Sequence, residues 1–264
     1  METLRLLKVE TSNAFVNMAV DEAILTARTL EKSPNTLRLY RWNPSAVSIG
    51  RNQQIENEVH VGNCKKLGVS LVRRISGGGT VFHDSWGEVT YALTANTSDV
   101  YAKDLMDVYS KVYSGLMDAL RILGITADFN GGDRKKCPNL TVKGRKISGS
   151  AQTRKRDVFL QHGTLLLDID LEKMFTLIRV PWARTCLEVL KVAESRITSV
   201  RNELGHAVTP ETAANAITIG FENALKMKAV EGELTSFEQD IARKLFKEKY
   251  FTDDWNLHAK SIVF

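Results

Sequence analysis

The chain has 264 residues, of which 43% are hydrophobic, and this composition supports an ordinary globular core. Its 36 basic and 31 acidic residues leave a net charge of +5, which suits an anionic ligand or an acidic protein surface and does not indicate nucleic-acid binding. No apolar run approaches the roughly 20 residues that span a bilayer, and the start of the chain lacks a signal-peptide core. We therefore expect no membrane association and a cytoplasmic location.

The N-terminal part of the chain alternates strand and helix signals. Leu4 to Val9 alternates like a half-buried strand, and Ser12 or Asn13 can cap an amphipathic helix that continues to about Leu30. Strand-like runs follow at Thr36 to Trp42 and at Ala46 to Ile49, separated by the turn pair Asn43-Pro44. These segments predict a mixed sheet.

The middle of the chain predicts further strands and one long helix. Apolar residues recur at helical spacing between Leu105 and Leu123, and Gly124 supplies a C-terminal stop, so we expect this helix to cover the sheet. The strands are predicted at Val69 to Arg74, Val81 to Phe82 and Glu88 to Ala95.

The remaining segments complete a single α/β domain. Apolar strands flank the turn Lys143-Gly144 and recur at Val158 to Leu167, which predicts an antiparallel hairpin and meander. Helices are predicted at Thr209 to Met227 and from about Ser236 to Tyr250. We expect one domain over residues 1–264, with a mixed, largely antiparallel sheet packed with helices and a helical C-terminal portion from about residue 209.

The most informative stretch runs from Arg73 to Asp84 and contains the triplet Gly77-Gly78-Gly79. Consecutive glycines between two strands let the backbone approach a ligand and turn N–H groups toward an anion, to which Arg73 or Arg74 can add a charged fork. The stretch predicts a cradle for a phosphate or a carboxylate. A glycine-rich hairpin beside a charged pair explains a lone triplet equally well.

A second stretch, Gly144 to Gln152, places Lys146 two residues after the hairpin glycine and among small residues that leave room for a substrate. Its ammonium could neutralise a phosphoryl group and polarise an acyl carbonyl, as an adenylate-forming enzyme requires. Taken alone, a lysine at such a position is more often a solvated strand end.

The third stretch runs from Leu160 to Asp168. His162 precedes Gly163 at the head of an apolar strand, where an imidazole could line a pocket and the glycine would permit close approach. By itself, a hydrogen-bonded structural histidine is the more common case.

Together, the three stretches resemble the lipoate-protein ligase family, whose catalytic domain is related in fold to biotin-protein ligases. The resemblance extends over nearly the whole chain. Besides the three stretches in order, it includes the opening helix with Asn17, Ala19 and Asp21-Glu22, the turn Ile49 to Gln53, Arg196-Ile197-Thr198, and Asp254-Trp255-Asn256.

The resemblance implies an enzyme that uses ATP and Mg²⁺ to convert lipoate to lipoyl-AMP and then transfers the lipoyl group to a lysine of an acceptor protein. It implies that Lys146 is the catalytic residue, in contact with the phosphate and the acyl carbonyl of the adenylate. The implied nucleotide and lipoate cradle comprises Arg74, Ser76, Gly77, Gly78, Gly79, Thr80, Val81 and Phe82, with His83, His162 and Thr164 in the same pocket. No metal ligands are assigned.

The resemblance also implies the partners. The expected acceptors are the lipoyl domains of the E2 subunits of 2-oxoacid dehydrogenases or the glycine-cleavage carrier protein, small domains that suit a positively charged enzyme. Larger ligases carry an additional small domain, whereas this chain stops at Phe264 and resembles the bipartite members. We therefore expect a small accessory protein, encoded separately, to complete the activation step.

The nearest alternative is an octanoyltransferase of the same superfamily, which takes its acyl group from an acyl carrier protein through a catalytic cysteine. Cys137 follows Arg134, Lys135 and Lys136, a setting that can lower a thiol pKa and make the sulfur nucleophilic. Cys137 stands only seven residues before Gly144, closer than we expect for that cysteine, and the complete glycine triplet is more like the ligases. These two features favour the ligase.

Two further readings stay open. A non-catalytic module that binds a lipoyl group or a nucleotide is possible, although Lys146 argues against it. The residue types also leave biotin or another short carboxylic acid open as the substrate, because the expected cradle recognises the adenylate more clearly than the acyl tail.

Overall fold

The computed structural model describes residues 2–131, 138–180, 182–183 and 185–260. Its centre is an eight-stranded sheet with the strand order β11-β1-β2-β6-β10-β9-β8-β7. The strands are β1 (Thr3–Ser12), β2 (Thr36–Trp42), β6 (Glu88–Asn96), β7 (Asp128–Asn130), β8 (Asn139–Val142), β9 (Arg145–Lys155), β10 (Val158–Leu166) and β11 (Lys228–Glu231). β1 pairs in parallel with β2 and β11, and the other neighbours pair antiparallel. The predicted mixed, mostly antiparallel sheet is confirmed.

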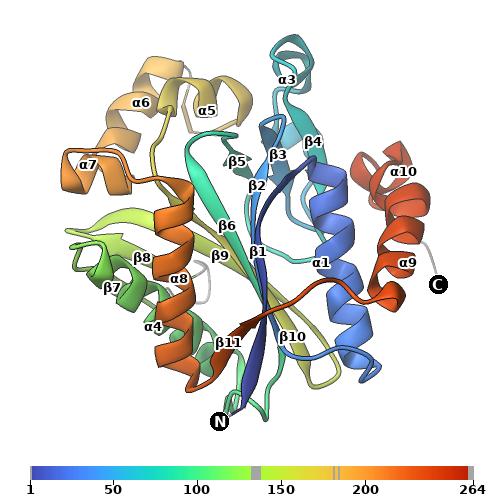
Figure 1. Cartoon of the computed structure of the whole chain (residues 1–264). Coiled ribbons are helices and arrows are strands. Elements are labelled where there is room, and N and C mark those ends of the chain that lie inside the picture. The colour runs from blue at the N-terminus through green and yellow to red at the C-terminus, as the bar shows by residue number, and fades with distance from the viewer. Residues whose placement is uncertain (1, 132–137, 181, 184, 261–264) are drawn as a thin grey trace.

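Helices cover both faces of this sheet (Figure 1). One face packs against α4 (Leu105–Ile122) and α8 (Pro210–Leu225), and the other packs against α1 (Ala14–Thr29) and α9 (Ser236–Leu245). The apolar spacing that predicted α4 is the buried stripe of this helix, and Asp104 caps its first turn by accepting from the backbone N–H of Asp107 at 2.9 Å. The π-helix η1 (Phe246–Tyr250) and α10 (Asp253–Asn256) follow α9.

A second, three-stranded sheet follows the end of β2 in the chain. It has the order β4-β3-β5, with β3 (Ala46–Ile49), β4 (Ser70–Arg73) and β5 (Val81–His83). Its own apolar cluster is closed by α2 (Ile55–Glu58), α3 (Val61–Lys66) and α5 (Leu171–Leu177). The helices α6 (Cys186–Glu194) and α7 (Val200–Leu204) precede α8. The functional site lies where the two sheets meet.

The structure contains several elements that the sequence did not predict, among them β7, α2, α3 and α10. The portion from about residue 209 contains a strand besides its helices, because β11 pairs with β1 at the edge of the main sheet. Four residues carry too little periodicity to announce such a strand. The helices α5, α6 and α7 were also not predicted. Among the described residues, no helix has the length and apolar character needed to cross a bilayer.

Candidate functional site

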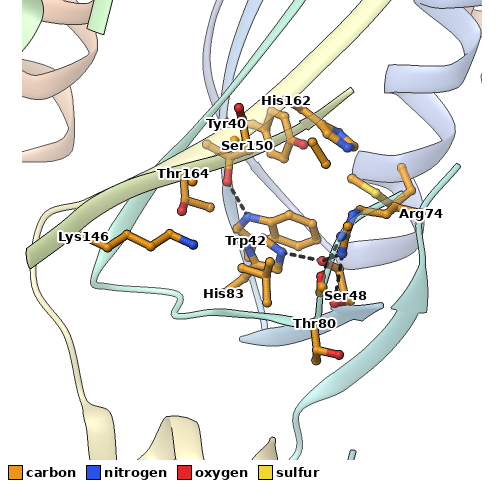
Figure 2. Close-up of a pocket in the computed structure, with 18 of the residues that line it drawn as sticks. Tyr40, Trp42, Ser48, Arg74, Thr80, His83, Lys146, Ser150, His162 and Thr164 are labelled. Atoms are coloured by element: carbon orange, nitrogen blue, oxygen red, sulfur yellow. Dashed lines mark hydrogen bonds between the residues drawn. The ribbon is translucent and has the colours of Figure 1, made fainter. Parts of the chain in front are cut away.

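A pocket lies between the small sheet and the strands β2, β6, β9 and β10 of the main sheet (Figure 2). Most of the residues that the sequence proposed for the site line this one cavity, although they come from distant parts of the chain. They are Arg74, Gly78, Gly79, Thr80, Val81, His83, Lys146, His162 and Thr164. The pocket thus brings the three sequence stretches together.

Lys146 is aimed into the pocket by an irregularity in the sheet. The pairing of β8 and β9 shifts register between Leu140 and Thr141, a bulge that re-aims the side chains at the start of β9. On the other side, the backbone of Lys146 donates to Arg196 at 2.7 Å and accepts from Thr198 at 2.9 Å. A Cβ atom at Gly149 would lie 2.6 Å from Lys146 Nζ, so this glycine makes the space through which the lysine reaches the cavity.

Arg74 holds the glycine loop. Its Nη2 donates to the carbonyls of Gly77 and Gly79, at 2.8 and 2.6 Å. Among the described residues, the backbone N–H groups of residues 77–79 have no protein acceptor, so they remain available for an anion or a developing oxyanion. The guanidinium of Arg74 therefore shapes the predicted cradle, whose donors are backbone N–H groups.

Arg73 is not part of the pocket lining. Its Nη1 donates to the carbonyls of Arg51 and Gln53, at 3.0 and 2.7 Å, and its Nε donates to the carbonyl of Trp255 at 3.0 Å. In return, Trp255 Nε1 donates to the carbonyl of Arg73 at 2.7 Å. Arg73 joins the small sheet to the C-terminal helix α10, so of the two arginines proposed as a charged fork only Arg74 reaches the site.

Three other residues proposed for the cradle do not line the cavity. Phe82 points into the apolar cluster of the small sheet. The carbonyl of Gly77 faces Arg74. Ser76 is fully buried, and its hydroxyl lies 2.7 Å from His162 Nε2. These three residues lie next to residues that line the pocket and do not line it themselves.

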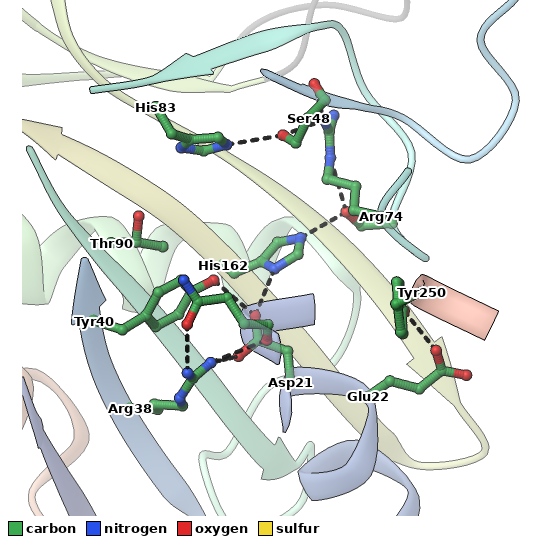
Figure 3. A network of polar contacts seen from close by, with 12 residues as sticks. Asp21, Glu22, Arg38, Tyr40, Ser48, Arg74, His83, Thr90, His162 and Tyr250 are labelled. Carbon is green, nitrogen blue, oxygen red and sulfur yellow. Dashed lines mark hydrogen bonds and ion pairs between the residues drawn. The ribbon is translucent and has the colours of Figure 1, made fainter. Parts of the chain in front are cut away.

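His162 belongs to a buried polar network that starts in α1 (Figure 3). His162 Nδ1 lies 3.0 Å from Asp21 Oδ2, and the same oxygen accepts a hydrogen bond from the hydroxyl of Tyr40 at 2.9 Å. The other carboxylate oxygen of Asp21 accepts from Arg38 Nη1 at 2.8 Å. Burial opposes ionisation of Asp21, but the hydrogen bond from His162 and the charge of Arg38 hold its pKa below the usual range. Asp21 is therefore a paired anion in the core.

His83 belongs to a second network with the same order of groups. Its Nδ1 lies 2.8 Å from Glu88 Oε1, and its Nε2 lies 2.9 Å from the hydroxyl of Ser48. The imidazole stacks on the indole of Trp42, with 3.9 Å between ring centroids. Glu88 Oε1 also accepts from Thr90 at 2.8 Å, whereas the buried Oε2 has no partner among the described residues.

Sequence reasoning missed several lining residues. Tyr40, Trp42, Ser48 and Thr90 line the cavity, but their strands carried no recognised motif. The available signal was alternation, because Arg38, Tyr40 and Trp42 occupy every second position of β2 and so share one face of the sheet. The other lining residues are Met18, Pro138, Gly149, Ser150, Ala151 and Gly163.

Cys137, the thiol proposed in the alternative reading, lies outside the described residues. The next residue, Pro138, lines the pocket, and its carbonyl accepts from the hydroxyl of Tyr113 at 2.9 Å. Cys64 is buried in the small sheet's cluster, where burial raises the pKa of its thiol. In the described part of the chain, no group of three or more His, Cys, Asp or Glu residues is arranged to hold a metal ion.

Comparison with known proteins gives matches over most of the chain. The model of the lipoyl protein ligase A/B catalytic domain matches residues 13–222. A protein named octanoyltransferase LipM from Kyrpidia tusciae is 37% identical over 97% of this chain and 99% of its own length. Other relatives of similar coverage, 30 to 35% identical, carry the same name.

Two of the solved structures that resemble this chain are of ligases. A bi-partite lipoate protein ligase from Thermoplasma acidophilum, studied with its E2 lipoyl domain, has a TM-score of 0.85 and 28% identity, with complete coverage of both chains. A lipoate-protein ligase A bound with ATP has a TM-score of 0.84 and 28% identity, covering 98% of this chain and 100% of its own.

These comparisons correct the main functional prediction. The sequence favoured an ATP-dependent lipoate-protein ligase aided by an accessory protein, but the full-length relatives at 30 to 37% identity are octanoyltransferases. The prediction was wrong because it depended on the complete glycine triplet and on the seven-residue spacing from Cys137 to Gly144, which favoured the ligase. ATP is a bound ligand in the similar structure of lipoate-protein ligase A.

Proposed function

Because the chain belongs to the lipoyl protein ligase A/B catalytic-domain family, we propose that it is an octanoyltransferase that moves an octanoyl group from an acyl carrier protein to a lysine of a lipoyl domain. The observation that carries the proposal is the name shared by the full-length relatives. The pocket, with Lys146 on one side and the glycine loop on the other, supports it.

The chemistry of the proposed donor explains why no nucleotide is needed. A thioester is already activated, so transfer to an amine requires a nucleophile, stabilisation of charge on the carbonyl oxygen and a positioned acceptor. In the proposed first step the sulfur of Cys137 attacks the thioester carbonyl, the donor's C–S bond breaks, and the proton of the Cys137 thiol passes to the leaving carrier thiolate. In the second, the acceptor's neutral amine attacks the acyl-cysteine, an amide forms, and Cys137 leaves as a thiol that takes up the proton lost by the amine.

We assign Lys146 the role of stabilising negative charge on the carbonyl oxygen in both steps. Gly78 and Gly79 of the glycine loop line the same cavity, and we assign their backbone N–H groups, which have no acceptor among the described residues, as further donors. One well-placed donor of this kind is worth roughly 2.7 to 4 kcal/mol in the transition state. His83, His162 and Thr164 complete the polar wall of the pocket.

The test is a transfer assay without nucleotide. Purified chain is mixed with an octanoylated acyl carrier protein and an apo lipoyl domain, and mass spectrometry follows the acceptor. We expect one octanoyl group on the acceptor lysine and an acylated enzyme in the absence of acceptor. Replacement of Cys137 by Ser should abolish both, whereas Cys64→Ala is the matched cysteine control. Modification only with ATP and free octanoate or lipoate would contradict the proposal.

A further inference from the structure

Ser48 is a buried hydroxyl in the pocket for which the proposed transfer has no use. It lies in β3, it is 1% exposed to bulk solvent, and it lines the cavity together with His83, Arg74 and the glycine loop. Glu88 Oε1, His83 and the hydroxyl of Ser48 form a continuous chain, with contacts of 2.8 and 2.9 Å. A carboxylate, an imidazole and a hydroxyl in this order are the arrangement that activates a serine nucleophile.

Arg74 determines where the proton of Ser48 points. Its Nη1 donates to the Ser48 hydroxyl oxygen at 3.1 Å, and a guanidinium cannot accept a hydrogen bond. The hydroxyl proton of Ser48 is therefore free to be donated to His83 Nε2. This leaves Nε2 as the unprotonated nitrogen, and Nδ1–H donates to Glu88. His83 is in the tautomer that a general base requires.

The same arginine links Ser48 to the glycine loop. Nη1 of Arg74 contacts Ser48, and Nη2 of the same guanidinium contacts the carbonyls of Gly77 and Gly79. The backbone N–H groups of residues 77–79 have no acceptor among the described residues. Such N–H groups stabilise the oxyanion of a tetrahedral intermediate.

We propose that Ser48, His83 and Glu88 form a serine hydrolase triad that cleaves medium-chain acyl thioesters and esters in the transfer pocket, a second activity independent of Cys137. The inference rests on the proposed function in one respect, namely that the pocket binds medium-chain acyl groups. Ser48 is the nucleophile, His83 the general base and Glu88 the residue that orients the imidazole.

The reaction balances with water as the co-reactant. Ser48 Oγ attacks the acyl carbonyl while its proton passes to His83 Nε2, and the thiol or alcohol leaves with that proton. A water molecule then gives a proton to His83 and its hydroxyl to the carbonyl carbon, and Ser48 regains its proton as the free carboxylic acid leaves. Because Ser48 is shielded from bulk solvent, the second step is the slow one, and the acyl-serine ester accumulates.

The test uses the full chain with Cys137→Ser as the background, so that acyl-cysteine formation does not contribute. A fluorophosphonate should label Ser48, as identified by peptide mapping, and p-nitrophenyl octanoate should give a burst followed by slow turnover. Ser48→Ala should remove the label and lower hydrolysis by at least about 10²-fold. The matched control is Ser45→Ala, which removes a nearby buried hydroxyl that bonds to Ser85 and does not line the pocket.

Two further variants keep the proposal falsifiable if Ser48→Ala folds poorly. Ser48→Cys keeps a nucleophile of similar size and should trap an octanoyl thioester at position 48. Glu88→Gln keeps the shape of the carboxylate and should slow the burst, since it removes the negative charge that stabilises the protonated His83. A folded Cys137→Ser protein that is never labelled at Ser48, or equal hydrolysis with and without Ser48, overturns the proposal.

The two proposals fail in different ways. Labelling of Ser48 without transfer to a lipoyl domain would reject the octanoyltransferase assignment and support the triad. Transfer that depends on Cys137 without any reaction at Ser48 would do the reverse.

Discussion

Two carboxylate-histidine-serine arrays contact Arg74, and they have the same order but different surroundings. Figure 3 labels Asp21 and His162 of one array and His83 and Ser48 of the other. In one, Asp21, His162 and Ser76 are joined by contacts of 3.0 and 2.7 Å, and in the other, Glu88, His83 and Ser48 by 2.8 and 2.9 Å. Arg74 donates to both serines, at 3.2 and 3.1 Å. The hydrogen-bond order alone therefore does not tell which array does chemistry.

Access and charge separate the two arrays. Asp21 has Arg38 as a buried countercharge, and Ser76 does not line the pocket, so this array joins α1 to the sheet. Glu88 has no such countercharge and one oxygen without a partner among the described residues, and Ser48 lines the cavity. We therefore expect changes in the array of Asp21, His162 and Ser76 to lower the free energy of unfolding. Changes in the groups that line the pocket should instead lower the rate of the reaction.

The largest effect on stability should come from Asp21→Asn. The change leaves the Arg38 guanidinium, which is only 3% exposed, without its buried partner, and breaking a buried pair costs about 3 to 5 kcal/mol. Urea unfolding measures the loss. The control is Asp240→Asn, which removes an exposed pair with Arg243 and should cost no more than about 1 kcal/mol. Equal costs would erase the distinction between the arrays.

Lys146→Met tests whether a charge that lines the pocket controls the rate of transfer. The side chain lies at the pocket and its stem passes over Gly149, so methionine keeps most of the packing and removes only the charge. We expect octanoyl transfer to fall by roughly 10²- to 10³-fold, equivalent to about 2.7 to 4 kcal/mol, with little change in the urea midpoint. Single-turnover transfer kinetics measure it, and a normal rate would remove Lys146 from the mechanism.

Gly163→Ala should have an intermediate effect on stability. A Cβ atom there would lie 2.4 Å from the carbonyl oxygen of Gly149, and the sheet has no room to yield, so we expect a loss of about 1 to 3 kcal/mol. Gly77→Ala is the control, since a Cβ atom there meets nothing within 4 Å. If both variants unfold at the same urea concentration, the close packing at Gly163 does not hold His162 in its contacts with Asp21 and Ser76.

Glu88→Gln should change stability least. The amide oxygen can still accept from His83 and Thr90, and the unpartnered oxygen loses no bond, so we expect a change within about 1 kcal/mol. This variant is the direct counterpart of Asp21→Asn, because both replace a buried carboxylate by its amide. A loss as large as that of Asp21→Asn, measured in the same urea series, would show that Glu88 has a hidden countercharge.

The stability contributed by Asp21 should also depend on pH, although only in acid and not near neutral pH. The pKa of Asp21 in the folded protein lies below its usual 3.8, so the unfolded state binds protons more readily. The stabilisation is fully present above the unfolded pKa and is lost as pH falls through the folded pKa. Urea midpoints measured below pH 3.8 should fall more steeply with decreasing pH in the native protein than in Asp21→Asn. Parallel slopes would contradict this.

Local patterns in the amino-acid sequence were enough to place several parts of the molecule. The apolar spacing from Leu105 placed the helix α4, and the glycine triplet and Lys146 marked the two walls of the pocket, because glycines and a lysine beside a turn carry a local signal. The sequence did not separate a ligase from a transferase correctly, since the glycine triplet and the spacing from Cys137 to Gly144 favoured the ligase. The relatives' names were needed for that step.

The grouping of the polar side chains depends on how the two sheets pack against each other. Ser48, His83 and Glu88 lie on three strands, β3, β5 and β6, which belong to two different sheets. Their contacts depend on how those sheets pack, and a hydrogen bond forms only within a few tenths of an ångström of the right distance. Sequence spacing does not contain that information, just as it did not contain the pairing of β11 with β1, because both arise from long-range packing.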